Sequence, residues 1–178
     1  MTETEVRTIF VSWASDELGL TLIKSNQAAS PPNRPYSTLS VLSEVSLGQK
    51  DEMRDINDSG IADFAGFRDA TISLQFYDDV NSSSGKTAFQ FAQEAVRSLN
   101  KKSVLDSFFF TDGIAIRQVL PINNTELFLD SINEQRAQFD VLIGYVDEFT
   151  DDVGFIETVE MESVLDPDVG EDITVDIS

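Results

Sequence analysis

The chain has no cysteine and no histidine among its 178 residues, and each absence excludes a set of functional sites. Without cysteine it has no disulfide framework and no thiolate that could bind zinc or an iron–sulfur cluster. Without histidine it lacks the side chain that most often transfers protons near neutral pH and that most often binds metals. Ser–His, Cys–His and histidine–metal mechanisms are therefore excluded.

Basic residues are also scarce, since 12 Lys and Arg stand against 32 Asp and Glu and the net charge is −20. Such a chain repels nucleic-acid phosphates and anionic membranes, so we expect neither sequence-specific nucleic-acid binding nor membrane contact. An acidic wall would still let DNA slide past without adhering. No apolar run approaches the roughly 20 residues of a membrane span. The first residues, M-T-E-T-E-V, lack the basic-then-apolar order of a signal peptide, so we expect synthesis in the cytoplasm.

The length of the chain and its apolar content fit one folded domain. Hydrophobic residues make up 41% of the sequence and include 13 Phe, which is enough for a core. From Ala137 onward there are 13 acids and no Lys or Arg, and the acids crowd the last residues. We expect a single α+β domain over residues 1–165. The acidic tail over residues 166–178 is expected to be disordered or to become ordered only with a partner.

The most regular stretch runs from Thr71 to Leu99. Polar and apolar side chains alternate from Thr71 to Phe76, which is the period of a half-buried strand. After a short polar loop, apolar residues recur three and four positions apart, as on one face of a helix. These residues are Ala88, Phe91, Ala92, Ala95, Val96 and Leu99. The sequence therefore predicts a strand that leads into an amphipathic helix.

Residues 2–18 are predicted to form the other helix. Thr2 and Glu5 have the spacing of a capping box, and Gly19 suits the end of the helix. Its apolar stripe consists of Val6, Ile9, Phe10 and Trp13. We expect this stripe to pack on a sheet, with a partner-binding helix as the less favoured alternative.

Shorter apolar runs predict the remaining strands, at residues 20–23, 39–47, 114–120, 139–145 and 155–164. Gly48 is expected to end the second of these strands. Residues 150–154, T-D-D-V-G, are typical of a hairpin loop that makes the last two strands antiparallel neighbours. The prolines of S-P-P-N-R-P-Y keep the segment before the second strand extended. The predicted fold class is α+β, with two helices packed on one mainly antiparallel or mixed sheet.

Residues 49–69 form a long polar and charged excursion between two predicted strands. A loop of this length is usually functional or mobile. We favour an extended, partly ordered loop whose order depends on neighbouring molecules. A projecting hairpin is the alternative, because Ile61, Phe64 and Phe67 provide apolar anchors.

The loop Gly85-Lys86-Thr87 matches the second half of the phosphate-binding pattern G-x-x-x-x-G-K-[ST], in the expected context between a strand and a helix. The first glycine of that pattern is Val80 here, which hinders the backbone from curling around a phosphate. The serines at positions 82–84 are better explained as caps of the following helix. A nucleotide-binding enzyme that uses this loop stays open as a less favoured alternative.

Neighbouring acids occur at Asp78-Asp79, Asp147-Glu148 and Asp151-Asp152. In a chain with 32 acids such pairs arise by chance, and none has the spaced ligands of a calcium-binding loop. Arg117 and Arg136 are isolated charges, which we assign to salt bridges at the surface or between subunits. The sequence therefore predicts no catalytic, cofactor-binding or metal-binding residue, no cofactor and no enzymatic activity.

Four further segments are informative through their order and spacing. They are S-N-Q-A-A-S-P-P-N-R-P-Y-S-T-L-S-V-L at 25–42, G-F-R-D-A-T-I-S-L-Q-F-Y at 66–77, E-Q-R-A-Q-F-D-V at 134–141 and G-F-I-E-T-V-E-M at 154–161. Together they resemble the phage neck or tail terminator family, small α/β proteins that cap the tail tube of long-tailed phages. The resemblance covers residues 6–164 and departs from the family at Asp78, where a glycine often follows the strand.

The resemblance implies a structural virion protein without catalysis. Family members form a hexameric ring at the head-proximal end of the tail tube, stop tube growth and join the tail to the head-side neck. The implied partners are further copies of the chain, the tail-tube protein, a head-side neck or connector protein and, in contractile phages, the sheath. Genomic DNA would only pass through the lumen. The implied location is the neck of the virion, after assembly in the host cytoplasm.

Ring contacts are expected at the first helix, the proline-rich segment, the Phe108–Phe110 run and the 49–69 excursion. Two other functions stay open beside the nucleotide-binding enzyme. One is another ring of the same assembly, such as a tail-tube or head-completion protein. The other is a small acidic interaction module unrelated to phages.

Overall fold

The computed structural model describes residues 1–25, 30–57, 59–79, 85–129, 132–154, 158–161 and 173–176. The chain groups into two compact units. The first comprises Met1–Asp51 and Ala65–Glu148, and the second comprises Glu52–Phe64 and Phe149–Ser178. Each unit is described by itself below.

A mixed sheet organises the first unit. Its strands are β1 (Thr21–Lys24), β2 (Tyr36–Ile56), β3 (Ile61–Asp79), β4 (Ala115–Val119), β5 (Asn123–Asn124), β6 (Leu127–Leu129) and β7 (Ile132–Asp152). The order is β1-β2-β3-β7-β4, and β5 and β6 also pair with β7. β1 runs parallel to β2, whereas β4, β5 and β6 run antiparallel to β7. The predicted α+β class with a mixed sheet is confirmed.

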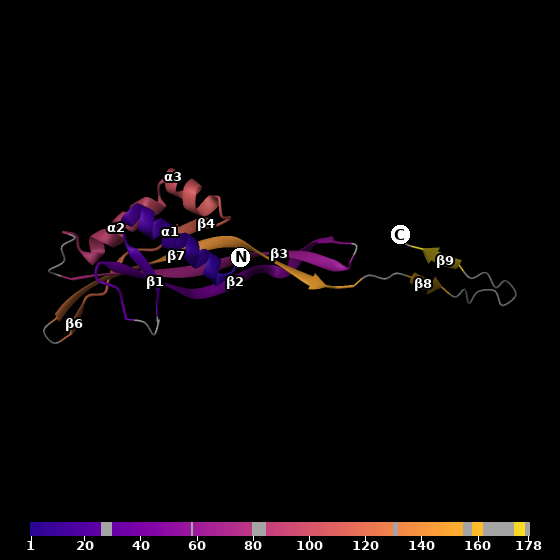
Figure 1. Cartoon of the computed structure of the whole chain (residues 1–178), viewed down its shortest axis with the longest axis horizontal. Coiled ribbons are helices and arrows are strands. Elements are labelled where there is room, and N and C mark those ends of the chain that lie inside the picture. The colour runs from indigo at the N-terminus through magenta and orange to yellow at the C-terminus, as the bar shows by residue number, and fades with distance from the viewer. Residues whose placement is uncertain are drawn as a thin grey trace. The chain divides into compact units, whose positions relative to one another are not determined.

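The helices α1 (Glu3–Leu18) and α2 (Ala88–Leu99) lie over the sheet of the first unit (Figure 1). The capping box at the start of α1 is formed, because Glu5 N donates to the Thr2 hydroxyl while Thr2 N donates to the Glu5 carboxylate. Gly19 ends the helix with a φ of 64°, as its position predicts. A further short helix, α3 (Lys102–Val104), continues as the π-helical turn η1 (Leu105–Phe110), and neither was predicted.

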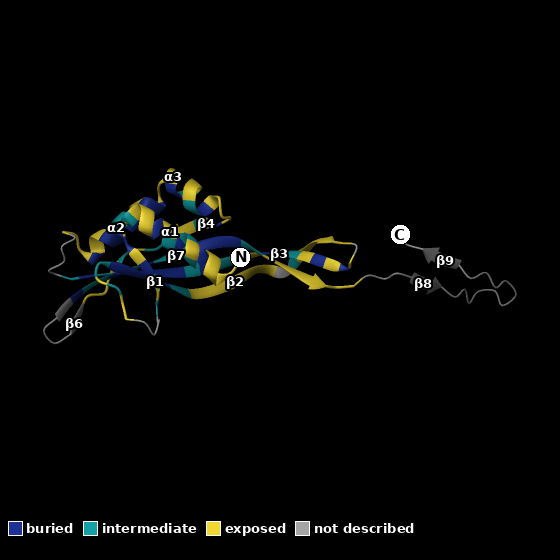
Figure 2. Ribbon diagram, in the orientation of Figure 1, coloured by how far each residue is buried: buried dark blue, intermediate teal, exposed yellow. Residues whose placement is uncertain are grey.

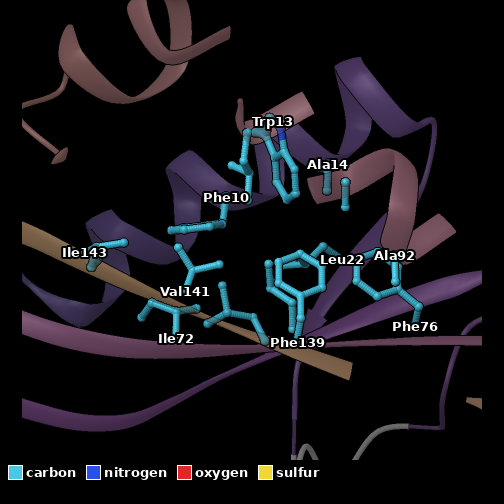
Figure 3. Packing of buried hydrophobic residues seen from close by; sticks show 14 of the residues in the cluster. Phe10, Trp13, Ala14, Leu22, Ile72, Phe76, Ala92, Phe139, Val141 and Ile143 are labelled. Atoms are coloured by element: carbon cyan, nitrogen blue, oxygen red, sulfur yellow. The ribbon is translucent and has the colours of Figure 1, made fainter. Parts of the chain in front are cut away.

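The core lies between these helices and the sheet. Phe10 and Trp13 point from α1 toward Ile72, Phe139 and Val141 on the strands (Figure 3). All five side chains are fully buried, and burial of each stabilises the fold by roughly 1.5–3 kcal/mol. In Figure 2 the buried residues of the first unit gather in the strands below the helices. The two apolar stripes read from the sequence are thus both core surfaces.

The 49–69 excursion is a β-hairpin, so the favoured loop was wrong and the alternative is correct. β2 does not end at Gly48, which adopts a φ of 111° inside the strand. The reversal occurs at Asn57–Gly60, where Gly60 N donates to Asn57 O and the Asn57 side chain accepts from Ile61 N. Polar and charged residues are frequent in both strands of the hairpin and do not alternate regularly with apolar ones, so the sequence gives no clear strand signal there.

The pairing predicted for residues 139–145 with residues 155–164 is also wrong. β7 continues to Asp152, past the expected loop start, and β8 (Thr158–Met161) pairs antiparallel with β9 (Ile173–Asp176) in a separate two-stranded sheet. β9 lies within the expected acidic tail, and its I-T-V-D sequence alternates apolar and polar residues. The other tail residues lie outside the described part, and the domain boundary at residue 165 stays a prediction.

Candidate functional site

The Gly85-Lys86-Thr87 loop is the entrance to α2. Thr87 caps the helix: its hydroxyl accepts from Gln90 N at 3.2 Å, and its own N–H donates to the Gln90 side chain at 2.8 Å. The Lys86 ammonium lies 2.7 Å from the Glu94 carboxylate and 5.3 Å from the centre of the Phe91 ring. The cap is therefore Thr87 and not the serines at 82–84, which lie outside the described residues, as does Val80. Lys86 and Thr87 thus make local contacts within α2 and its entrance and are not arranged to bind a phosphate.

The paired acids form no shared site. Asp78 is buried and accepts a hydrogen bond from Asp79 N, Asp147 accepts from the Met1 amino group, and Asp152 accepts from Gly154 N. Among the described residues, no three acidic side chains are placed to hold a metal ion. Likewise, none of the helices described is long and apolar enough to span a bilayer.

Arg68 organises a polar cluster on the first unit. Its guanidinium donates to both carboxylate oxygens of Asp51, at 2.7 and 2.8 Å, and to the Ser46 hydroxyl at 3.0 Å. The Asp147 carboxylate lies 3.5 Å away. Hydrogen bonds from Arg68 lower the pKa of Asp51. A side chain at Gly66 would collide with the Asp51 carboxylate, so the close ion pair requires glycine there.

Tyr145 connects β7 to β2. Its hydroxyl donates to the Glu44 carboxylate at 2.6 Å, although Glu44 itself is solvent-exposed. Burial of the ring, together with the neighbouring Glu44 charge, raises the pKa of Tyr145. The bond joins the two strands that flank β3 in the sheet.

A second cluster brings together three of the four segments that carry the family resemblance. Tyr36 and Tyr77 stack with their ring centres 4.7 Å apart and their planes 9° apart. The Arg136 guanidinium lies 5.1 Å from the centre of the Tyr77 ring. Glu134 accepts from both Arg136 and Arg34, residues about one hundred positions apart in sequence. This cluster attaches the proline-rich segment to the sheet.

Arg117 also pairs within the chain. Its guanidinium on β4 lies 2.9 Å from the Asp69 carboxylate on β3, so it passes over the intervening strand β7. At the crossing point β7 has Gly144, where a Cβ atom would collide with the Arg117 side chain. Arg117 and Arg136 were assigned to salt bridges at the surface or between subunits, and both form intramolecular pairs on strands of the sheet. Sequence reasoning missed their acidic partners, which lie on other strands or two residues away.

The segments expected at ring contacts have different surroundings. In the apolar stripe of α1, Val6, Phe10 and Trp13 are buried and Ile9 is partly buried. Phe109 is fully buried, whereas Phe110 is 51% exposed. On β2 and β3 the first unit exposes further large apolar side chains. These are Leu42, Val45, Leu47 and Phe67. The exposed apolar surface therefore lies on the strands more than on α1.

The second unit contains the tip of the β2–β3 hairpin and the end of β7. Phe64 and Phe149 stack with ring centres 5.2 Å apart, and the N–H groups of Val153 and Gly154 both donate to Gly60 O at 3.1 Å. The end of β7 thus lies against the hairpin within this unit. Its exposed apolar side chains are Met53, Ile56, Ile61, Phe149 and Val153. They make this β-ribbon a candidate binding surface.

A groove of about 780 Å³ opens on the first unit between the N-terminal half of α1, the turn before β4 and the outer part of β7. Ile9 and Val146 provide apolar lining, and Glu5, Asp112 and Glu148 provide carboxylates. The pKa of Glu5 is lowered by the hydrogen bond from Thr2 N. Met1 also lines the groove, and its amino group lies 3.0 Å from the Asp147 carboxylate. Three lining carboxylates stand against this one ammonium group, so the groove is apolar and acidic in character.

Among the described residues, neither the polar clusters nor the groove has the arrangement of side chains that a catalytic centre requires. The exposed apolar side chains on the strands favour binding to other macromolecules. No curated protein matches the chain. A family model described as phage neck terminator protein matches residues 4–168, which is most of the chain and includes every cluster above. The matched range includes all four segments that carry the resemblance, at 25–42, 66–77, 134–141 and 154–161. The chain belongs to the phage neck terminator protein family.

Proposed function

We propose that this chain forms a closed hexameric ring on the head-proximal end of a phage tail tube. There it stops tube polymerisation and joins the tail to the neck proteins on the head side. The observation that carries the proposal is the family match over residues 4–168, because that family consists of structural neck proteins. The proposed location is accordingly the neck of the virion.

The proposed ring requires a rigid subunit with two different contact surfaces, since a head-to-tail ring joins unlike patches of successive subunits. Rigidity is supported by the buried aromatic core and by ion pairs between segments far apart in the sequence, such as Arg34 with Glu134 and Arg117 with Asp69. Exposed apolar residues on β2 and β3 are available for contacts. These features suit a subunit that assembles without changing its fold.

The net charge of −20 supports a passive relation to DNA. A lumen with acidic walls repels phosphates, so genomic DNA could pass with little adhesion during ejection. The same charge makes unassisted association between copies costly, particularly at low ionic strength. Ring formation is therefore expected to need favourable local charge contacts or the tube as a template.

The β-ribbon of the second unit is the surface we propose for the tube protein or, in a contractile phage, the top of the sheath. Met53, Ile56 and Ile61 are each at least 39% exposed on this ribbon. Replacing Ile56 and Ile61 with serine removes apolar contact area while leaving the turn residue Asn57 in place. The double variant should keep its fold and bind tube ends more weakly than a control that replaces the exposed Ser12 of α1 with alanine.

The decisive experiment combines the purified chain with its tube protein. Native mass spectrometry and electron microscopy should show six copies of the chain in a ring at one end of each tube. Antibody labelling of intact particles should mark a single position between head and tail. Labelling along the whole tail would identify a tube protein instead, and a chain that stays monomeric with tubes present would overturn the ring proposal.

A further inference from the structure

The turn between α2 and α3 is the most basic place on this acidic chain. Arg97, Lys101 and Lys102 occur within six positions, with no acid between Glu94 and Asp106. The Lys101 side chain is 58% exposed and lies 3.2 Å from Glu17, and the Lys102 side chain is 85% exposed and lies 2.6 Å from Asp106. The two acids leave one uncompensated positive charge, and the lysines remain accessible to a partner.

The groove described above has the complementary character. Its carboxylates come from α1, from the turn before β4 and from β7, that is, from Glu5, Asp112 and Glu148. Ile9 and Val146 supply apolar surface beside them. A lysine suits such a groove because its methylene stem packs on apolar side chains while its ammonium group meets carboxylates.

The basic turn and the groove lie at opposite ends of α1. Glu5 in the first turn of the helix lines the groove, whereas Glu17 in the last turn contacts Lys101. The twelve-residue separation along the helix corresponds to about 18 Å at ~1.5 Å per residue. Two unlike, complementary patches that are well separated on one rigid unit are what a head-to-tail contact between identical subunits requires.

We propose that the basic turn of one copy of this chain docks into the groove of the next copy, with Lys102 beside Asp112 and Glu148. The inference rests on the proposed ring and names the contact that holds it together. Subunits of charge −20 repel one another, and this arrangement places cations where two copies meet. The contact lowers the electrostatic cost of closing the ring and sets the order of the subunits.

Charge reversal tests the contact directly. Self-association of the wild type, with tube ends present if they are needed, is compared with Lys102→Glu, Asp112→Lys and the combined variant by analytical ultracentrifugation. Each single reversal places like charges opposite each other and should weaken association at least about tenfold. The combined variant should recover most of the loss. Circular dichroism should be unchanged, because Lys102 and Asp112 are both exposed.

Lys86→Glu is the matched control. It changes the net charge by the same amount, but Lys86 precedes α2 and lies at the other end of that helix from the basic turn. Its association should stay within about twofold of the wild type, since exposed charges away from a contact contribute little. If Lys86→Glu weakens association as much as Lys102→Glu, total charge explains the effect and the docking contact is refuted.

Two further outcomes separate this inference from the proposed function. A wild-type ring that is unaffected by Lys102→Glu and Asp112→Lys refutes the docking contact and leaves the ring proposal standing. A wild type that fails to associate even with tube ends refutes both. Raising the salt concentration from about 0.05 M to about 0.5 M should weaken the wild-type contact more than that of Lys102→Glu.

Discussion

Replacing Phe109 with alanine tests whether the run of phenylalanines before β4 is part of the core. Phe109 is fully buried, and its ring lies 5.2 Å from that of Phe10 and 6.2 Å from that of Trp13. Removing a buried Phe typically costs about 3–5 kcal/mol, because the site loses transfer free energy and keeps a cavity. For a chain of this size the melting temperature should fall by about 6–20 °C.

Phe110→Ala is the matched control, since the neighbouring ring is 51% exposed and removes far less surface from water. Its cost should stay near about 1 kcal/mol or below. Urea titration and scanning calorimetry of the two variants measure the difference in unfolding free energy. Equal losses for Phe109→Ala and Phe110→Ala would contradict the core position of Phe109. A large loss of ring assembly with Phe110→Ala alone would mark that side chain as a contact between subunits.

Substitutions at Gly144, Tyr145 and Thr87, together with one ligand test, probe the sheet and the loop. Gly144→Ala should displace Arg117 from Asp69 and cost no more than about 1 kcal/mol, and a double-mutant cycle with Arg117→Gln should show that the two effects do not add. Tyr145→Phe should cost about 1.5–3 kcal/mol near neutral pH, because the bond to a charged carboxylate is lost. The folded-state pKa of Tyr145 is raised, so its stability contribution is complete below the unfolded pKa of about 10 and declines at higher pH. The wild type should therefore lose its advantage over Tyr145→Phe in chemical unfolding above about pH 10, and an unchanged gap there would contradict this. Thr87→Ala should cost about 1 kcal/mol by loss of the helix cap, whereas Thr87→Ser should be nearly neutral. ATP with magnesium should not raise the melting temperature, and a clear shift would revive the nucleotide-binding alternative.

The helices and central strand could be predicted because their signals are local. Apolar residues three and four apart specify one face of a helix, and α1 and α2 bury the stripes read from the sequence. The cap at Thr2 and the stop at Gly19 depend on a few neighbouring residues, and both are confirmed. The cap of α2 was misassigned to serines because Thr87 had been read as part of a phosphate-binding pattern. The Gly85-Lys86-Thr87 sequence fits both a phosphate-binding loop and a helix cap, and the hydrogen bond from Gln90 N to the Thr87 hydroxyl identifies the cap.

The strand partners at the C-terminal end could not be predicted in the same way. Strand pairing depends on which edges remain open in the folded sheet, and alternation within one strand carries no information on its partner. Residues 139–145 were paired with the next strand in sequence, since sequential strands often are neighbours. In the structure β7 instead pairs with the preceding elements β4, β5 and β6, and β8 pairs with β9. The acidic tail was interpreted from its charge alone, so the strand β9 was not predicted.

The ion pairs show most clearly where sequence reasoning ends and what the structure adds. Arg34 and Glu134 are a hundred residues apart, and no pattern in the sequence links them before the strand order is known. In a chain with 32 acids every arginine has many possible partners, so charge alone cannot select one. The fold of the sheet determines which residues meet, and it places Tyr36, Tyr77 and Arg136 side by side. The same reasoning applies between subunits. An acidic surface offers many sites to a cation, and the groove beside α1 is one place where three carboxylates lie beside apolar side chains. Reversal of charge at both ends of the proposed contact therefore tests geometry, because only a docked pair can be restored by exchanging its charges.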